Sequence, residues 1–262
     1  MMQEGRGELS KGTPVEIARA IWDEHAQWWR ATFSEGADIE YAQEIVPLVI
    51  GMFAGRRHVL DLGCGEGQIA RALCRANEVI EIIGLDPSNA QLSNARNVAS
   101  PAISYVQGAA EQVPFADGSF DGVVCCLAIE HCEDVDRVLN EVARVLGPGG
   151  LFFLLINHPM YQGIGSGFVD DRILGEHYWR VGPYLEERVA FEEVDRGVIL
   201  PFAHRPLSRY INPLGAHDLV LVEMFEPPPL PAFLTDSTDP ELESTIPRLL
   251  AMLFEHRPRP TI

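Results

Sequence analysis

Basic residues are scarce in this sequence. Its 262 residues include 20 Lys and Arg against 38 Asp and Glu, which gives a formal net charge of −18 at pH 7. A surface with this charge repels phosphate groups. We therefore expect no nucleic-acid partner and no docking on anionic membranes.

Long hydrophobic runs are also lacking. The longest stretch that resembles a membrane segment, 151–156, is far shorter than the roughly 20 residues that a membrane-spanning helix needs. The first 13 residues contain no apolar stretch of the kind found in secretory signals. We predict a cytoplasmic location and no membrane contact.

Cysteine is rare and irregularly spaced. The five cysteines stand at positions 64, 74, 125, 126 and 132, and no pair has CxxC spacing. An odd number in this arrangement argues against a disulfide framework and against a structural zinc site. We expect reduced thiols and no bound metal.

What the sequence does contain, from residue 58 onward, is an alternation of short apolar runs with amphipathic stretches. This alternation is typical of a parallel sheet with crossover helices. The predicted strands are 58–62, 81–86, 103–107, 122–126, 151–156, 219–225 and 249–255, and the predicted helices are 68–76, 88–98 and 135–146. Two helices are expected before the sheet, the first opened by a capping box of Thr13 and Glu16.

The segment 157–217 has an irregular pattern in which aromatic residues and histidines are interleaved with Gly and Pro. Insertions of this length are often lids or binding elements. We therefore divide the chain into an N-terminal tail with helices (1–55), a core (56–156 and 218–257) and an inserted acceptor-binding lid (157–217).

The most informative segment is Asp61-Leu-Gly-Cys-Gly-Glu-Gly67, between the first strand and the first helix of the core. Glycines permit positive φ angles and close approach of the backbone to a ligand, and the helix behind them begins with free N–H groups. Nineteen residues after Gly67, Asp86 ends the next strand. A carboxylate at that place can accept both hydroxyls of a ribose, so we predict a nucleoside ligand.

Two details distinguish between nucleosides. A nicotinamide dinucleotide site has the spacing G-x-G-x-x-G, whereas the third glycine here comes one residue early. Asp61 would repel a pyrophosphate but attract an ammonium group or a positively charged ligand. Both details argue against a nicotinamide dehydrogenase.

These residues resemble the class I S-adenosylmethionine-dependent methyltransferases of the type 11 subgroup. The resemblance extends to residues 108–115 (GAAEQVPF), 120–124 (FDGVV), 129–131 (IEH) and 146–150 (LGPGG). It implies an α/β, Rossmann-like fold with a seven-stranded, mostly parallel sheet that includes one antiparallel strand. Helices would cover both faces of this sheet.

The resemblance also implies S-adenosyl-L-methionine as cofactor and S-adenosyl-L-homocysteine as product. The implied cofactor-binding residues are Tyr41, Asp61, Gly63, Cys64, Gly65, Gln68, Asp86, Pro87, Ala110, Glu111, Cys126 and Leu127. Trp28 and Trp29 would fold over the cofactor with Tyr41, or else pack in the core. Some relatives carry a metal-binding Glu where this chain has Leu127, so no metal is transferred.

Candidates for work on the acceptor follow the strands or lie in the predicted lid. His131, His158 and His204 could each remove a proton from an acceptor, or each could be a hydrogen-bonded structural residue. The predicted substrate-binding residues are Tyr161, Tyr178, Trp179 and Arg205. The aromatic rings would stack on the acceptor or pack within the lid, and the arginine would bind an anionic group or form a salt bridge.

We predict a methyltransferase that acts on a small-molecule acceptor at oxygen, as a monomer or homodimer. Two alternatives stay open. The acidic charge would suit a basic protein or peptide substrate, and a regulatory protein could hold the cofactor without turnover.

Overall fold

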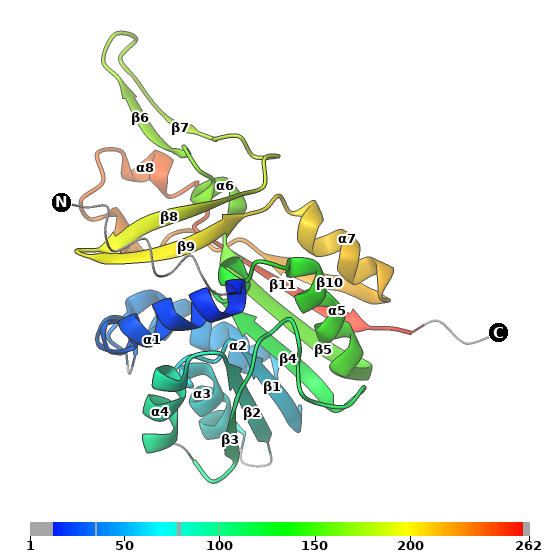
Figure 1. Cartoon of the computed structure of the whole chain (residues 1–262). Helices are drawn as coiled ribbons and strands as arrows, with labels where there is room; N and C mark the ends of the chain where they lie inside the picture. Colours follow the sequence, from blue (N-terminus) through cyan, green and yellow to red (C-terminus); the bar gives the residue numbers. More distant parts are fainter. Residues whose placement is uncertain (1–12, 35, 78–79, 99, 259–262) are drawn as a thin grey trace.

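The computed structural model describes residues 13–34, 36–77, 80–98 and 100–258. Its centre is a seven-stranded sheet in the order β10-β11-β5-β4-β1-β2-β3 (Figure 1). The strands are β1 (His58–Leu62), β2 (Glu81–Asp86), β3 (Ile103–Gln107), β4 (Phe120–Cys126), β5 (Leu146–Asn157), β10 (Leu219–Phe225) and β11 (Leu249–His256). Strand β11 runs antiparallel to both β5 and β10, whereas the remaining neighbours pair in parallel. The predicted fold class is confirmed.

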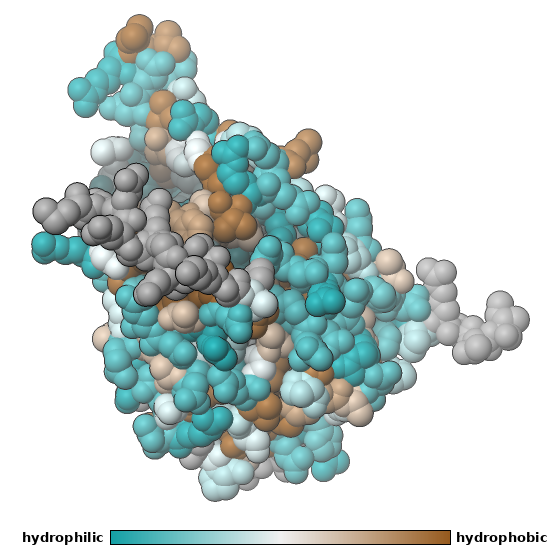
Figure 2. Space-filling view, in the orientation of Figure 1, coloured by the Kyte–Doolittle hydropathy of each residue, from teal (hydrophilic) through white to brown (hydrophobic). Residues whose placement is uncertain are grey.

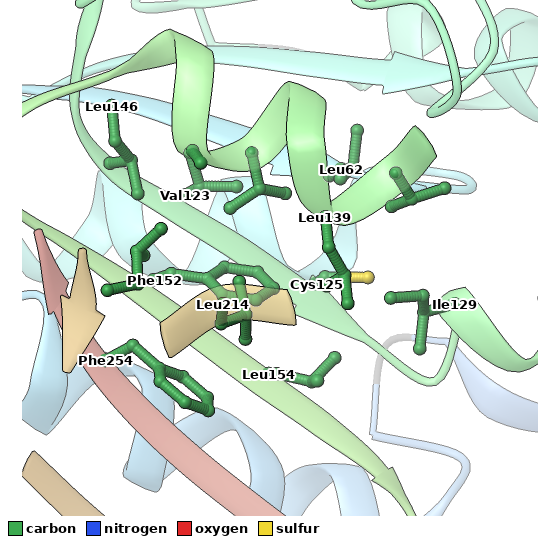
Figure 3. Close-up of a cluster of buried hydrophobic side chains, with 14 of the residues drawn as sticks. Leu62, Val123, Cys125, Ile129, Leu139, Leu146, Phe152, Leu154, Leu214 and Phe254 are labelled. Atoms are coloured by element: carbon green, nitrogen blue, oxygen red, sulfur yellow. The ribbon is translucent and has the colours of Figure 1, made fainter. Parts of the chain in front are cut away.

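Helices cover both faces of the sheet because its central strands are apolar on both sides. In β5, Phe152 and Leu154 point into one core cluster and Phe153 and Leu155 into the other. The first cluster is closed by α5 (Val135–Val145) and α7 (Ser208–Ala216), and Figure 3 shows Leu139 and Leu214 meeting over the strands there. The second is closed by η2 (Tyr41–Ile45), α2 (Val46–Met52) and α3 (Gln68–Ala76).

The N-terminal helix α1 (Pro14–Phe33) is anchored across the carboxyl ends of the strands. Thr13 caps it, and the predicted capping box with Glu16 is present. In the middle of α1, Asp23 accepts hydrogen bonds from the Ser88 hydroxyl (2.7 Å) and the Ala90 N–H (3.0 Å) at the start of α4 (Asn89–Asn97). A carboxylate at a helix N-terminus is favourable, so Asp23 ties α1 to the core.

The inserted segment is more regular than its sequence indicates. It contains α6 (Pro159–Gln162), the hairpin of β6 (Gly167–Asp171) and β7 (Glu176–Arg180), and the hairpin of β8 (Arg188–Asp195) and β9 (Val198–His204). No strands were predicted in this segment, because its turn glycines and Pro201 interrupt the alternation that would indicate them. The helix α7 at its end places Tyr210 and Leu214 in the main core. The division into core and lid stays a proposal.

The two hairpins lie differently. The β6–β7 hairpin projects away from the sheet, and hydrophobic atoms gather at its tip in Figure 2. The β8–β9 hairpin lies beside α1, where Ile21 packs with Val198 and Leu200. Across the described residues, we find no helix long and apolar enough to cross a membrane.

Candidate cofactor and acceptor site

A cavity of about 500 Å³ lies where β1, β2 and β4 end, beneath α1 and the β8–β9 hairpin. In parallel α/β sheets this edge is the usual place for ligands. The structure brings all twelve predicted cofactor residues to this one cavity: Tyr41, Asp61, Gly63, Cys64, Gly65, Gln68, Asp86, Pro87, Ala110, Glu111, Cys126 and Leu127. Their role in binding a ligand stays a prediction.

The three glycines of the loop all have positive φ, at 74°, 52° and 81° for Gly63, Gly65 and Gly67. A Cβ on Gly63 would lie 2.4 Å from Cβ of Ala128, and one on Gly67 would lie 2.1 Å from the hydroxyl of Tyr105. A Cβ on Gly65 would meet no atom closer than Nε1 of Trp29, at 3.9 Å. Two glycines therefore allow close packing, whereas Gly65 keeps its side of the cavity open.

Asp86 is held at the end of β2 by two backbone donors. Its Oδ2 accepts from the Gly65 N–H and its Oδ1 from the Ser88 N–H, both at 2.8 Å. An ionised carboxylate has about four acceptor positions, so about two remain for a ligand. Burial raises the pKa of Asp86 to about 6, although the two hydrogen bonds favour the ionised form and act to lower the pKa.

The cavity wall is acidic. Carboxyl groups line it at Asp61, Glu66, Asp86, Glu111, Glu130 and Glu133, and no Lys or Arg of the described residues does so. Asp61 is only 2% exposed and accepts one hydrogen bond, from the Ala70 N–H at 3.1 Å. Burial raises its pKa to about 7. Such a cavity favours a cationic ligand over an anionic one.

His131, in the 3₁₀ turn η3 (Ile129–His131) after β4, is the predicted histidine that lines the cavity. Its ring packs against Trp22 of α1 and Phe202 of β9. Its Nδ1 lies 2.7 Å from the carbonyl of Pro201. A carbonyl only accepts, so Nδ1 carries the proton in the neutral ring and Nε2 keeps its lone pair. Burial lowers the pKa of His131 to about 4, so the ring is neutral at pH 7.

The other two histidines lie outside the cavity. His158 caps α6 through Nδ1, which accepts from the Met160 N–H, and its Nε2 is 2.9 Å from Glu226. His204 pairs through Nε2 with the carbonyl of Tyr184, at 2.8 Å. Both rings are buried and engaged in local contacts.

The four predicted substrate-binding residues do not line the cavity either. Tyr161 stacks on Trp179 with ring centres 4.9 Å apart, and Tyr178 lies partly exposed on the projecting hairpin. Arg205 is 4% exposed and donates to the carbonyls of Ile129, Cys132 and Glu133. This arginine holds the loop after β4 in place.

Sequence reasoning missed several cavity residues. Trp22 and Ile21 come from α1, and Phe191 and Pro201 from the β8–β9 hairpin, with no motif to mark them. Glu130 was also missed, although it precedes His131 in the matched IEH segment. Its Oε1 accepts from both the backbone and side-chain nitrogens of Asn157, and its buried Oε2 has no hydrogen-bond partner among the described residues. Burial raises the pKa of Glu130 to about 7.

Comparisons with known proteins point to one family. Residues 60–154 match the family model described as a methyltransferase domain. The chain is similar to a ubiquinone biosynthesis O-methyltransferase of Paracidovorax citrulli, with 33% identity over 55% of this chain and 62% of that protein. It is also similar to a sterol 24-C-methyltransferase of Gibberella zeae, with 33% identity over 68% of this chain and 47% of that protein.

A solved structure agrees with these matches. The S-adenosylmethionine-dependent methyltransferase of Mesorhizobium loti superposes with a TM-score of 0.67 and 27% identity, covering 80% of this chain and 96% of that one. Among the curated relatives, the chain spans between 26% and 63% of the full length. The family and the fold imply S-adenosylmethionine as cofactor. The matched domain, the sheet order and the solved neighbour together support a class I S-adenosylmethionine-dependent methyltransferase.

Proposed function

We propose that the protein transfers the methyl group of S-adenosylmethionine to a hydroxyl oxygen of a small-molecule acceptor. The observation that carries the choice of oxygen is His131, a neutral ring at the cavity wall with Nδ1 bonded to Pro201 and Nε2 unprotonated. Methylation of a hydroxyl requires the loss of its proton. That proton becomes far more acidic as the oxygen gains the methyl group, so a ring whose pKa is lowered to about 4 can still accept it. Relatives that are O-methyltransferases support the same choice.

The residues of the cavity fit the cofactor. Asp86 has acceptor positions left for a pair of ribose hydroxyls, and the space beside Gly65 is open. Asp61 and the neighbouring acids offset the positive charge of an ammonium or sulfonium group. Tyr41 and Trp29 line the same cavity and can cover the ligand from above.

The chemistry divides between cofactor and protein. When bound, the cofactor supplies an electrophilic methyl group whose carbon–sulfur bond breaks as the new bond to the acceptor oxygen forms. The protein excludes water with α1 and the β8–β9 hairpin and holds the acceptor near His131. Nε2 of His131 receives the acceptor proton, and the Nδ1–H bond to Pro201 keeps the ring oriented. Positioning and proton removal are thus the protein's contributions.

We also propose a cytoplasmic setting and a small-molecule acceptor rather than a protein. All five cysteines are free, and Cys64, Cys125, Cys126 and Cys132 line the cavity. Reduced thiols at these positions agree with a reducing compartment. The cavity is covered by α1 and the β8–β9 hairpin, which favours a small molecule over the surface of a folded protein.

The test uses His131→Asn with radiolabelled S-adenosylmethionine and a panel of phenols and alcohols. Asparagine keeps a donor for the Pro201 carbonyl but cannot accept the proton as a base. We expect a fall in kcat of about 10²- to 10⁴-fold, with affinity for S-adenosylhomocysteine within about threefold of wild type. Unchanged kcat on a methylated hydroxyl would refute the role of His131. Tight cofactor binding with no acceptor methylated would favour the regulatory alternative.

A further inference from the structure

The part of the cavity next to His131 has apolar walls from two elements. Helix α1 contributes Val15, Ala18, Ile21 and Trp22, and the β8–β9 hairpin contributes Val189, Phe191, Pro201 and Ala203. These side chains bring no hydrogen-bonding group except the indole N–H of Trp22. An acceptor that fills this space gives up contact with water along most of its surface, which is favourable only for apolar groups.

The apolar wall continues out of the cavity along the β8–β9 hairpin. Val189 lies opposite Ala203, and Phe191 opposite Pro201, so these four residues share one face of the hairpin. All four line the cavity, yet Val189 is 50% exposed and Phe191 64% exposed. The exposed face and the cavity therefore form one continuous apolar surface.

Charge restricts the acceptor further. The carboxyl groups of the cavity, with no lining Lys or Arg among the described residues, repel a carboxylate or phosphate. Beside the cavity, a second and more open hollow is lined by Arg137, Arg188, Arg205 and Arg209. Arg137 pairs with Asp134, Arg188 with Glu186, and Arg209 with both Asp136 and Glu187. Arg205 is buried and its guanidinium donates to three backbone carbonyls. Each of the four arginines therefore has partners within the protein, and the mouth offers an anionic group little attraction.

We infer that the acceptor carries no negative charge and is largely apolar, and that it is longer than the cavity. Its hydroxyl end lies by His131, and its remaining apolar part lies on Val189 and Phe191. This inference rests on the proposed function but adds the substrate class and the residues that select it. We expect the site to reject a small molecule that carries the same hydroxyl group but is otherwise polar or anionic.

The test is a binding series with 4-alkylphenols in the presence of saturating S-adenosylhomocysteine. Phenol, 4-butylphenol and 4-octylphenol are titrated by calorimetry, together with an octyl analogue whose chain ends in a carboxylate. We expect affinity to rise by about twofold to fourfold for each buried CH₂. The carboxylate analogue should bind at least about tenfold more weakly than 4-octylphenol.

Two serine variants locate the effect. Phe191→Ser should remove most of the gain between 4-butylphenol and 4-octylphenol. Val194→Ser, on an exposed valine of the same hairpin that does not line the cavity, should keep it. If Phe191→Ser unfolds, Val189→Ser provides the same comparison. Equal affinities across the wild-type series, or tighter binding of the carboxylate analogue, would overturn the inference. Failure of S-adenosylhomocysteine to bind would instead overturn the proposed function.

Discussion

The backbone N–H of Gly65 donates a 2.8 Å hydrogen bond to Oδ2 of Asp86. Through this bond the glycine loop after β1 and the acid at the end of β2 form one unit. The acid fixes the loop in its left-handed conformation, and the loop keeps the buried carboxylate partly satisfied. A substitution at either residue therefore acts on the other, and binding and stability must be measured together.

Substitutions in the glycine loop should distinguish the glycine that leaves room for the ligand from the glycine that allows close packing of the protein. In Gly65→Ala the new Cβ enters open cavity space, and φ of 52° costs about 1–2 kcal/mol. We expect S-adenosylhomocysteine affinity to fall at least about tenfold, with a Tm loss of a few degrees. Gly63→Ala places its Cβ 2.4 Å from Ala128 and should lower Tm much more. Calorimetry and thermal unfolding on both variants check this, and full cofactor affinity in Gly65→Ala would contradict it.

Cofactor affinity should depend on pH through the buried acids. The pKa of Asp61 is raised to about 7 and that of Asp86 to about 6, so both take up protons as pH falls from 8 to 6. The protonated acids no longer attract a cation. A group with a pKa of about 7 that must ionise for binding weakens affinity about tenfold at pH 6. Titration with S-adenosylmethionine at both pH values measures this.

Asp61→Asn is the control for that titration. This variant should bind the cofactor more weakly at pH 8 but lose little further affinity at pH 6, apart from the smaller contribution of Asp86.

The buried acids Asp61 and Asp86 also affect the stability of the fold. Their folded pKa lies above the unfolded value, so the folded state holds protons that the unfolded state releases between about pH 4 and 7. Their burial therefore favours folding at low pH and opposes it as pH rises through 7. The Tm difference between Asp61→Asn and wild type, without ligand, should grow from pH 5 to pH 8.

Arg205 should act on stability rather than on acceptor binding. The buried guanidinium donates to three backbone carbonyls in the loop that carries His131. Arg205→Met leaves these carbonyls unpaired, at a cost of about 3–5 kcal/mol and a Tm loss on the order of 10 °C. Arg209→Met, which breaks only half-exposed ion pairs, should cost about 1 kcal/mol or less. Equal Tm values for the two variants would disprove the structural role of Arg205.

The sequence predicts the sheet well because its strands are continuous apolar runs with abrupt ends. The predicted bounds of β1, β2, β3 and β10 coincide with those observed. Strand β5 begins at Leu146 rather than Leu151, because the glycine-rich stretch expected to be a turn pairs with β4 through Leu146 and Phe120. The glycine loop and Asp86 were also predictable, since glycine spacing and an acid at a strand end have direct chemical reasons.

The acceptor side was less predictable because tertiary contacts build it. The hairpin β8–β9 contains Pro201, which normally argues against a strand, and the sequence of β8 mixes charged and apolar residues. Nothing local in α1 indicates that Ile21 and Trp22 face a cavity. His131 was chosen for its place after β4 and His158 for its place after β5, but only His131 lines the cavity. His204 was chosen for its place in the predicted lid and also lies outside the cavity. A strand end places a residue near the right edge but does not give its side-chain direction.

The most direct measurement of the central claim is calorimetric titration of S-adenosylhomocysteine into wild type, Asp86→Asn and Asp86→Ala. We expect one site per chain in wild type and a loss of about 2–4 kcal/mol, or roughly 30- to 1,000-fold, in Asp86→Ala. Asp86→Asn should lose less because one acceptor oxygen remains. NADH should not bind to any of the three. Wild-type affinity in Asp86→Ala, or binding of NADH in place of S-adenosylhomocysteine, would contradict the account.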